Sequence, residues 1–199
     1  MHPAIAQTLA RLPGARYFQH DLKDVTRLPQ LVDAIETAIG PITTLVSNAG
    51  VPAKMAGDML AIAPENFDFV LDINLRGSFF LAQEVARRML AAPSAHYRSM
   101  LFVTSVSAQM ISVERAEYCL SKSAAATMAQ LFAVRMAPHG VGVFDLRPGI
   151  IDTAMTAAVH DKYSARIAEG LVPAQRWGLP VRGGGVRGGG RPPRRGDSM

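Results

Sequence analysis

The sequence predicts an α/β fold in which helices cover both faces of a doubly wound parallel sheet. Short apolar runs rich in strand formers, at residues 43–47, 100–104 and 141–146, alternate with longer stretches whose apolar residues recur at helical spacing. The stop signal Gly40-Pro41 separates one helical stretch from the strand after it. Because parallel strands need crossover helices, this alternation indicates a three-layer αβα arrangement with right-handed crossovers.

The elements are expected in a regular order. They are a helix near 2–12, a strand at 16–19, a helix near 25–39, a strand at 43–47, a helix near 64–91, a strand at 100–104, a helix at 115–137 and a strand at 141–146. Pro64 stands in the first turn of the longest helix, where its missing N–H costs nothing. Pro138-His139-Gly140 breaks the connection before the last strand. Short helices near 152–158 and 160–170 are expected to form a mobile substrate lid.

Composition places the chain among soluble α/β proteins with one sizeable core. It has 199 residues, of which 49% are hydrophobic. The single Cys119 excludes an intramolecular disulfide, and neither cysteines nor histidines have the spacing of metal ligands. The chain has neither an apolar run of about 18 residues nor the apolar core of a signal peptide. We therefore expect a cytoplasmic protein without a metal or a membrane partner.

Tyr118 and Lys122 are the most informative pair of residues. On a helix, positions i and i+4 project from the same face, one turn apart. A lysine ammonium beside a phenol favours the phenolate, and so lowers the tyrosine pKa from about 10 toward neutrality. Such a tyrosine exchanges a proton with a substrate oxygen at working pH. The spacing alone is a weak signal, because it also occurs on solvated helix faces.

Other polar residues are expected at the same edge of the sheet. Ser105 follows the strand at 100–104, and the carboxyl ends of strands are where open α/β sheets hold ligands. The turn after the strand at 43–47 ends in Gly50, and its small residues leave room for a flat ligand against the backbone. Asn74 falls on the apolar stripe of the longest helix, where a polar side chain needs a partner. Taken alone, Asn74 has a simpler explanation as a satisfied core asparagine.

Together these segments resemble the short-chain dehydrogenase/reductase family, whose members have a Rossmann-like fold. The turn Ser47-Asn48-Ala49-Gly50 is similar to the family's N-N-A-G turn, with serine in place of the first asparagine. The segment 147–153 resembles its P-G-x-x-x-T motif. The stretch 115–119 is particularly similar to members that are 3-oxoacyl-[acyl-carrier-protein] reductases. The resemblance covers about residues 1–178, which we expect to form one domain.

The resemblance implies a catalytic set and a cofactor-binding set of residues. The catalytic set is Asn74, Ser105, Tyr118 and Lys122. The cofactor-binding set is Asp21 and Leu22 at the adenine, Asn48, Ala49 and Gly50 in the turn, Tyr118 and Lys122 at the ribose, and Pro148, Gly149, Ile151 and Thr153 at the carboxamide.

The family mechanism that the resemblance implies is hydride transfer between the nicotinamide of NAD or NADP and a substrate carbonyl. In it Tyr118 donates the proton, Ser105 holds the substrate oxygen, Lys122 lowers the tyrosine pKa, and Asn74 anchors a water of the proton relay.

Both ends of the chain depart from the family pattern. No segment of this sequence matches the family's T-G-x-x-x-G-x-G turn, which binds the cofactor pyrophosphate. The family's first βαβ unit, which contains that turn, therefore has no counterpart in this sequence. The residue that selects NAD or NADP through the ribose is absent with it, so the sequence does not reveal this choice. The last family strand has no counterpart either. We therefore expect weak or no cofactor binding by this chain.

The tail at 179–199 is expected to be disordered, because it is rich in Gly, Arg and Pro and lacks apolar periodicity. It carries +4 of the chain's net charge of +5. Arg/Gly segments do bind RNA, but no aromatic residue lies among these arginines. We interpret the tail as the product of a shifted reading frame rather than as a nucleic-acid-binding segment. Resequencing the gene and finding no nearby frame that restores a helix and a strand would contradict this hypothesis.

The remaining alternatives concern substrate and partners. The expected pocket residues Gln109, Met110, Ile111, Arg115, Met155 and Tyr163 are mostly apolar, which favours an acyl chain. A sugar or polyol dehydrogenase is the runner-up. The resemblance also implies a homo-oligomer formed through helices 64–91 and 115–137. An inactive remnant that only associates through these helices is the alternative from another functional class.

Overall fold

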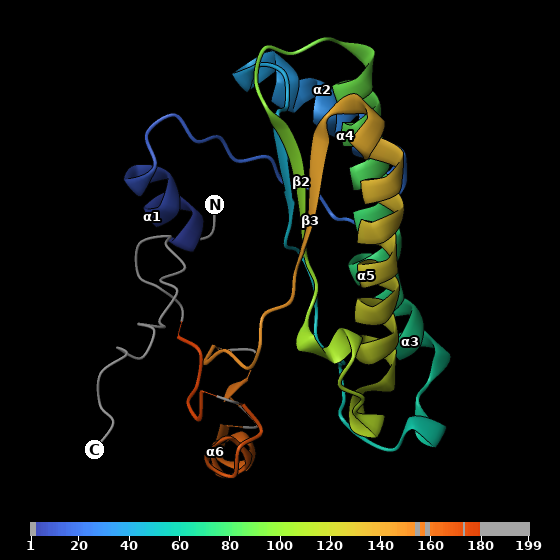
Figure 1. Ribbon diagram of the computed structural model, residues 1–199, viewed down its shortest axis with the longest axis vertical. Helices are drawn as coiled ribbons and strands as arrows, with labels where there is room; N and C mark the ends of the chain where they lie inside the picture. Colours follow the sequence, from blue (N-terminus) through green and yellow to red (C-terminus); the bar gives the residue numbers. More distant parts are fainter. Residues whose placement is uncertain (1–2, 154–155, 158–159, 173, 180–199) are drawn as a thin grey trace, which may run out of the picture. The chain divides into compact units, whose positions relative to one another are not determined.

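The computed structural model describes residues 3–153, 156–157, 160–172 and 174–179. The described residues form two compact units, one that ends at Pro148 and one that begins at Gly149 (Figure 1). The helices of the first unit are α1 (Pro3–Arg11), α2 (Leu28–Ile39), α3 (Pro64–Leu71), α4 (Ser78–Ala91) and α5 (Ala116–Met136). The second unit contains α6 (His160–Ala168). None of the helices among the described residues is long and apolar enough to span a bilayer.

A parallel sheet of three strands organises the first unit. Strands β1 (Thr44–Ser47), β2 (Arg98–Val103) and β3 (Val141–Leu146) lie side by side in that order. Leu45 pairs with Met100, and Met100 pairs with Val143, so one row of side chains crosses the whole sheet. This topology confirms the predicted α/β class with a parallel sheet.

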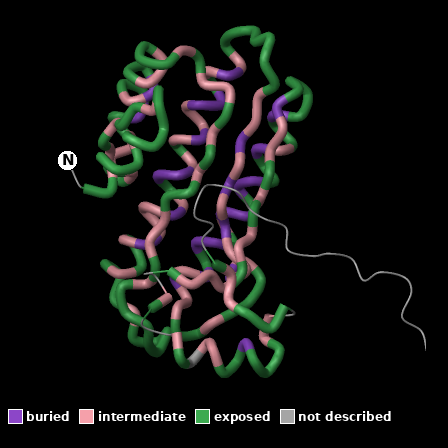
Figure 2. Tube along the Cα trace, turned by 90° about the vertical axis from the view of Figure 1, so that its left-hand side faces the viewer, coloured by how far each residue is buried: buried purple, intermediate pink, exposed green. Residues whose placement is uncertain are grey.

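The core lies between this sheet and the helices on one of its faces. Met100 and Phe102 of β2 are buried against residues of α4 and α5, and the Phe102 ring stacks on Phe132 with 5.7 Å between centroids. Figure 1 shows α4 and α5 side by side along this face, and Figure 2 shows buried positions recurring along the helices and strands. The opposite face carries Val46 and Phe144, which are 54% and 52% exposed.

The predicted long helix at 64–91 is confirmed, but it is not continuous. Between α3 and α4 lies a turn of π-helix, Asp72–Gly77, which we call the π-turn. Short 3₁₀ turns precede or follow other elements, at Val25–Arg27, Met59–Ala61, Val106–Ala108, Val113–Arg115 and Ala137–His139. The predicted breaks are confirmed: Gly40 caps α2 at φ 87°, and Gly140 is left-handed at φ 69° before β3. Both conformations suit glycine, which has no Cβ to clash.

The predicted strand at 16–19 is wrong. Residues 15–20 have no regular secondary structure, and no described segment pairs with them as a neighbouring strand. An apolar segment becomes a strand only when another strand satisfies its backbone groups.

Within the second unit, a short parallel bridge joins the segment around Ile151 to the segment around Gly178. Ile151 pairs with Gly178, whose N–H donates to the Ile150 carbonyl at 2.9 Å. Trp177 donates from Nε1 to Ser164 Oγ at 3.0 Å, which ties α6 to the segment before the bridge. The helix predicted at 160–170 is confirmed as α6, and its role as a lid stays a prediction. The helix predicted at 152–158 and the tail beyond Leu179 lie partly or wholly outside the described residues.

Candidate active site

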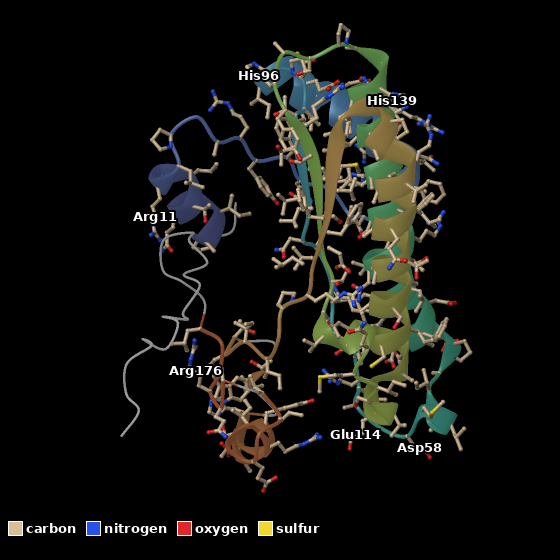
Figure 3. All side chains as sticks on the ribbon, in the orientation of Figure 1. Arg11, Asp58, His96, Glu114, His139 and Arg176 are labelled. Carbon is tan, nitrogen blue, oxygen red and sulfur yellow. The ribbon has the colours of Figure 1, made fainter. Side chains whose placement is uncertain are left out.

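The carboxyl ends of β1 and β2 bring the predicted catalytic residues of the first unit together. Strand β2 ends at Val103, two residues before Ser105, and α5 begins at Ala116, so Tyr118 lies in its first turn. Figure 3 labels Asp58 and Glu114 at the end of the sheet where α5 begins, and His96 and His139 at the opposite end. The polar residues therefore gather where parallel sheets commonly hold ligands.

Ser105 and Tyr118 contact one another directly. The Ser105 hydroxyl is close enough to the Tyr118 phenol to lower its pKa, and Ser105 Oγ accepts the N–H of Ser107 at 3.0 Å. The bond from Ser107 makes Ser105 the cap of the 3₁₀ turn at 106–108, which fixes the direction of its hydroxyl. A serine and a tyrosine held in this way offer two hydroxyls to one substrate oxygen.

The Tyr118 pKa shifts in the direction opposite to the prediction. Burial is the largest influence and raises the pKa above its ordinary value of 10.0, while the Ser105 hydrogen bond and the Arg115 charge lower it. Lys122 Nζ lies 5.8 Å from the centre of the tyrosine ring. In the chain alone, loss of water around the phenol therefore outweighs the nearby cations.

Lys122 is buried beside the end of β2. Its side chain is 7% exposed, and Nζ donates to the Val103 carbonyl at 3.1 Å. Burial lowers the Lys122 pKa, and the charge of Asp145 opposes that shift. The ammonium is thus held in place by a neutral acceptor, and the charge of a carboxylate on β3 favours its protonated form.

Asn74 lies in the π-turn, and its side chain forms two hydrogen bonds to the backbone of Val51, after β1. Its amide donates to the Val51 carbonyl at 3.0 Å, and its Oδ1 accepts the Val51 N–H at 2.8 Å. A further bond of 3.1 Å runs from Nδ2 to Ser121 Oγ. Asn74 is 3% exposed, and both polar atoms of its side chain are hydrogen-bonded, as expected for a satisfied core asparagine; its role in the candidate site stays a prediction.

The turn after β1 packs closely against this cluster. A Cβ on Gly50 would lie 3.3 Å from Asn74 Oδ1 and 3.5 Å from Lys122 Nζ. Asn48 and Ala49 remain exposed. A small cavity of about 10 Å³ lies between this turn and β2, lined among others by Asn74 and Lys122. That volume suits one water molecule among polar groups.

Leu22, next to Asp21, lies against the same π-turn. A Cβ on Gly77 would come within 2.3 Å of the Leu22 carbonyl oxygen, so only glycine allows this approach. Arg76 donates to the Lys23 carbonyl at 3.3 Å. The Asp21 carboxylate is exposed and accepts the Lys23 N–H at 3.0 Å. The structure thus brings the predicted adenine contacts to the element that carries Asn74.

The predicted carboxamide segment is divided between the two units. Pro148 belongs to the first unit, where its carbonyl accepts the Val106 N–H at 3.1 Å. Gly149, Ile151 and Thr153 belong to the second. There the Thr153 N–H donates to Thr156 Oγ1 at 3.0 Å.

Sequence reasoning missed Ser121, Thr104 and Asp145. Ser121 has no exposed surface; it accepts from Asn74 and donates to the Tyr118 carbonyl at 2.8 Å. Its position between Tyr118 and Lys122 was the available signal. For Asp145 the signal was a carboxylate inside an otherwise apolar strand.

Comparisons with known proteins identify relatives of this chain. The chain is 32% identical over 166 residues to the 3-oxoacyl-[acyl-carrier-protein] reductase MabA of Mycobacterium tuberculosis, a match that covers 83% of this chain and 65% of that protein. It is 28% identical over 162 residues to 2-dehydro-3-deoxy-D-gluconate 5-dehydrogenase of Escherichia coli, covering 80% and 62%. The chain thus matches less than two thirds of the length of these curated relatives.

A solved structure and a family model extend the comparison. A 3-oxoacyl-[acyl-carrier protein] reductase from Brucella melitensis, in complex with NAD, superposes with a TM-score of 0.85 at 44% identity, over 90% of this chain and 72% of that one. The model of the family described as short chain dehydrogenase matches residues 2–164. With its parallel sheet and its extended sequence match, this chain belongs to the short-chain dehydrogenase family of oxidoreductases.

Proposed function

We propose that this chain carries the catalytic residues of an NAD(P)-dependent reductase that converts a ketone to a secondary alcohol. The observation that carries the proposal is that four polar residues meet at the carboxyl ends of β1 and β2. Ser105 acts on the Tyr118 pKa, Lys122 is buried against the Val103 carbonyl, and Asn74 fixes the adjoining turn. A proton donor, an oxygen-binding hydroxyl and a cation at one sheet edge are what carbonyl reduction needs.

In the proposed reaction, the protein positions the carbonyl oxygen and supplies its proton. A bound nicotinamide would supply the hydride to the carbonyl carbon. Ser105 Oγ and the Tyr118 hydroxyl bind the substrate oxygen, and Tyr118 transfers its proton as negative charge develops there. The Lys122 ammonium stabilises the phenolate that results. Asn74 keeps the turn at Val51 in place.

The residues present fit the nicotinamide half of such a cofactor. Asn48 and Ala49 leave the backbone after β1 exposed, and Gly50 has no side chain to fill the space beside Asn74 and Lys122. No described residue forms the glycine-rich turn that would bind the pyrophosphate. We therefore propose that the chain alone binds NADH or NADPH weakly.

A 3-oxoacyl thioester is the proposed substrate, and a sugar acid is the second candidate. Met110 and Ile111 follow the Ser105 turn and are exposed, as an acyl-binding surface would be. The relatives include both reductases of 3-oxoacyl groups and dehydrogenases of 2-dehydro-3-deoxy-D-gluconate. Comparing turnover of an acetoacetyl thioester with that of the sugar acid decides between them.

The decisive experiment is a fluorescence titration of the purified chain with NADH and NADPH, followed by a turnover assay at the highest soluble concentration. We expect binding weaker than micromolar and slow reduction of an acetoacetyl thioester. Tyr118→Phe removes the proton donor, and we expect turnover to fall by a factor of about 10² to 10⁴ with cofactor affinity unchanged. Turnover equal in both proteins would contradict the assignment of Tyr118.

A non-catalytic role is the alternative, and the exposed side of α5 favours it. Leu120, Leu131 and Val134 are all more than half exposed on this helix. Apolar side chains grouped on one helix indicate a surface that associates with another molecule. A folded chain without any turnover, which still forms dimers, would support this role over the enzymatic one.

A further inference from the structure

Asp145 of β3 is held by two partners at the carboxyl end of the sheet. Thr104 Oγ1 donates to its Oδ1 at 2.5 Å, and Arg147 Nε forms an ion pair with its Oδ2 at 2.7 Å. Its side chain is 18% exposed. A carboxylate with both oxygens engaged in this way has a fixed position.

The Thr104 bond fixes the residue that joins two parts of the candidate site. The residue before Thr104 is Val103, whose carbonyl receives Lys122, and the residue after it is Ser105, which contacts Tyr118. The Thr104 N–H also donates to the Leu146 carbonyl at 2.8 Å, so the ends of β2 and β3 are joined twice. A shift of Thr104 would therefore move the acceptor of Lys122 and the partner of Tyr118 together.

Asp145 is also the carboxylate whose charge acts on Lys122. The ammonium is buried, and its hydrogen bond goes to a neutral carbonyl, which compensates only part of the cost of removing a charge from water. The Tyr118 phenol on its own helix and the neutral amide of Asn74 in the π-turn lie close to it. From β3, the charge of Asp145, which is paired with Arg147, raises its pKa.

We propose that Asp145 is a positioning residue that keeps Lys122 protonated and in place, through its charge and through its bond to Thr104. This inference rests on the proposed function, because it explains how a buried lysine stays available to stabilise the Tyr118 phenolate. It assigns a role to a strand residue outside the Ser105, Tyr118 and Lys122 cluster. Arg147 moderates that role, since its own positive charge partly offsets the carboxylate.

The protonation of Lys122 can be measured without any turnover. The chain has four lysines, Lys23, Lys54, Lys122 and Lys162, so labelling with ¹³C- and ¹⁵N-lysine gives few side-chain signals to follow against pH. The signal lost in Lys122→Arg identifies the residue. In Asp145→Asn, which keeps an oxygen for Thr104 but loses the charge, we expect the Lys122 titration midpoint to fall by about one pH unit.

Two further variants separate charge from structure. Arg147→Gln removes the competing cation, so the Lys122 midpoint should rise, opposite to its shift in Asp145→Asn. Asp145→Glu should restore most of the wild-type value. Asp33→Asn, which neutralises an exposed partner of Arg88, should leave the midpoint unchanged.

An unchanged midpoint in folded Asp145→Asn, or shifts in the same direction for Asp145→Asn and Arg147→Gln, would overturn the proposal. If Asp145→Asn does not fold, the Arg147→Gln shift decides: a rise supports the proposal and no rise overturns it. None of these measurements needs cofactor or substrate. A chain without reductase activity would therefore still show whether Asp145 changes the Lys122 titration midpoint, and the two proposals can fail independently.

Discussion

Tyr118 combines an ionisable hydroxyl with surroundings that exclude much of the water from its ring. Desolvation penalises the phenolate, and the hydrogen bond from Ser105 and the charge of Arg115 offset only part of that penalty. A reductase needs the tyrosine to ionise only while the substrate oxygen takes its proton. A raised pKa in the free chain therefore keeps the proton on Tyr118 until a ligand changes its surroundings.

The raised Tyr118 pKa predicts how stability depends on pH. The folded state holds this proton more tightly than the unfolded chain, so the resulting stability is present below the ordinary tyrosine pKa of 10.0 and is lost as pH rises through the folded value. Tyr118→Phe lacks this dependence. We expect the free energy of unfolding of the wild type to fall relative to that of Tyr118→Phe as the pH rises above about 9, through 10 and beyond.

Urea unfolding of the wild type and of Tyr118→Phe across this pH range measures the difference between their free energies of unfolding. The other tyrosines and the lysines titrate in both proteins, so their contributions cancel in this difference. A difference that moves in favour of the wild type with rising pH would mean that Lys122 dominates and that the Tyr118 pKa is lowered after all.

Local spacing predicted that Tyr118 and Lys122 lie close together, but it did not predict the direction of the Tyr118 pKa shift. Positions i and i+4 place Tyr118 and Lys122 on one helix face whatever the rest of the chain does. The net sign of a pKa shift depends on burial and on charges from distant strands, such as that of Asp145, which adjacent residues in the sequence do not reveal. The roles of these residues stay predictions.

The π-turn is the element that joins the candidate site to the core. An extra residue in one helical turn redirects the side chains within it, and such turns are frequent at functional sites. Here the turn presents Asn74 to Val51 and Ser121, while Gly77 approaches Leu22. Helical periodicity predicted the whole segment as one helix, since a single inserted residue leaves the apolar pattern on both sides intact.

Asn74→Ala tests the two hydrogen bonds between the Asn74 side chain and the Val51 backbone. The substitution removes the partners of both Val51 backbone groups, and we expect it to lower the free energy of unfolding by about 2 kcal/mol, because buried polar groups left unpaired are costly. Asn66→Ala, on the half-buried side of α3, is the matched control and should change stability far less. Equal effects of the two substitutions would mean that the Val51 contacts contribute nothing particular.

Gly77→Ala tests the close approach of Leu22 to the π-turn. The new Cβ would meet backbone at 2.3 Å, so the chain must shift, and we expect a loss of about 1–3 kcal/mol of stability. Gly57 has no atom within 4 Å of its position for a Cβ, so Gly57→Ala should be nearly neutral. Thermal unfolding of both variants gives the comparison, and a neutral Gly77→Ala would show that the segment at 21–22 moves freely.

At the scale of the whole molecule, the described part of the first unit leaves two apolar surfaces in contact with solvent. One is the side of α5 with Leu131 and Val134, which are 61% and 78% exposed. The other is the second face of the sheet, with Val46 and Phe144. Alternation along the chain predicted the parallel sheet with helices on both of its faces. Among the described residues, the core lies on one face, while Val46 and Phe144 leave the other exposed.

These surfaces predict association in solution, and two matched substitutions identify the surface responsible. Leu131→Glu and Phe144→Glu each place one carboxylate on an exposed apolar position, where it opposes burial in an interface. We propose that the chain forms dimers through α4 and α5, so sedimentation velocity should show monomers for Leu131→Glu and dimers for Phe144→Glu. The reverse result would assign the association to the open face of the sheet, and it would remove the structural reason for treating α5 as an interface.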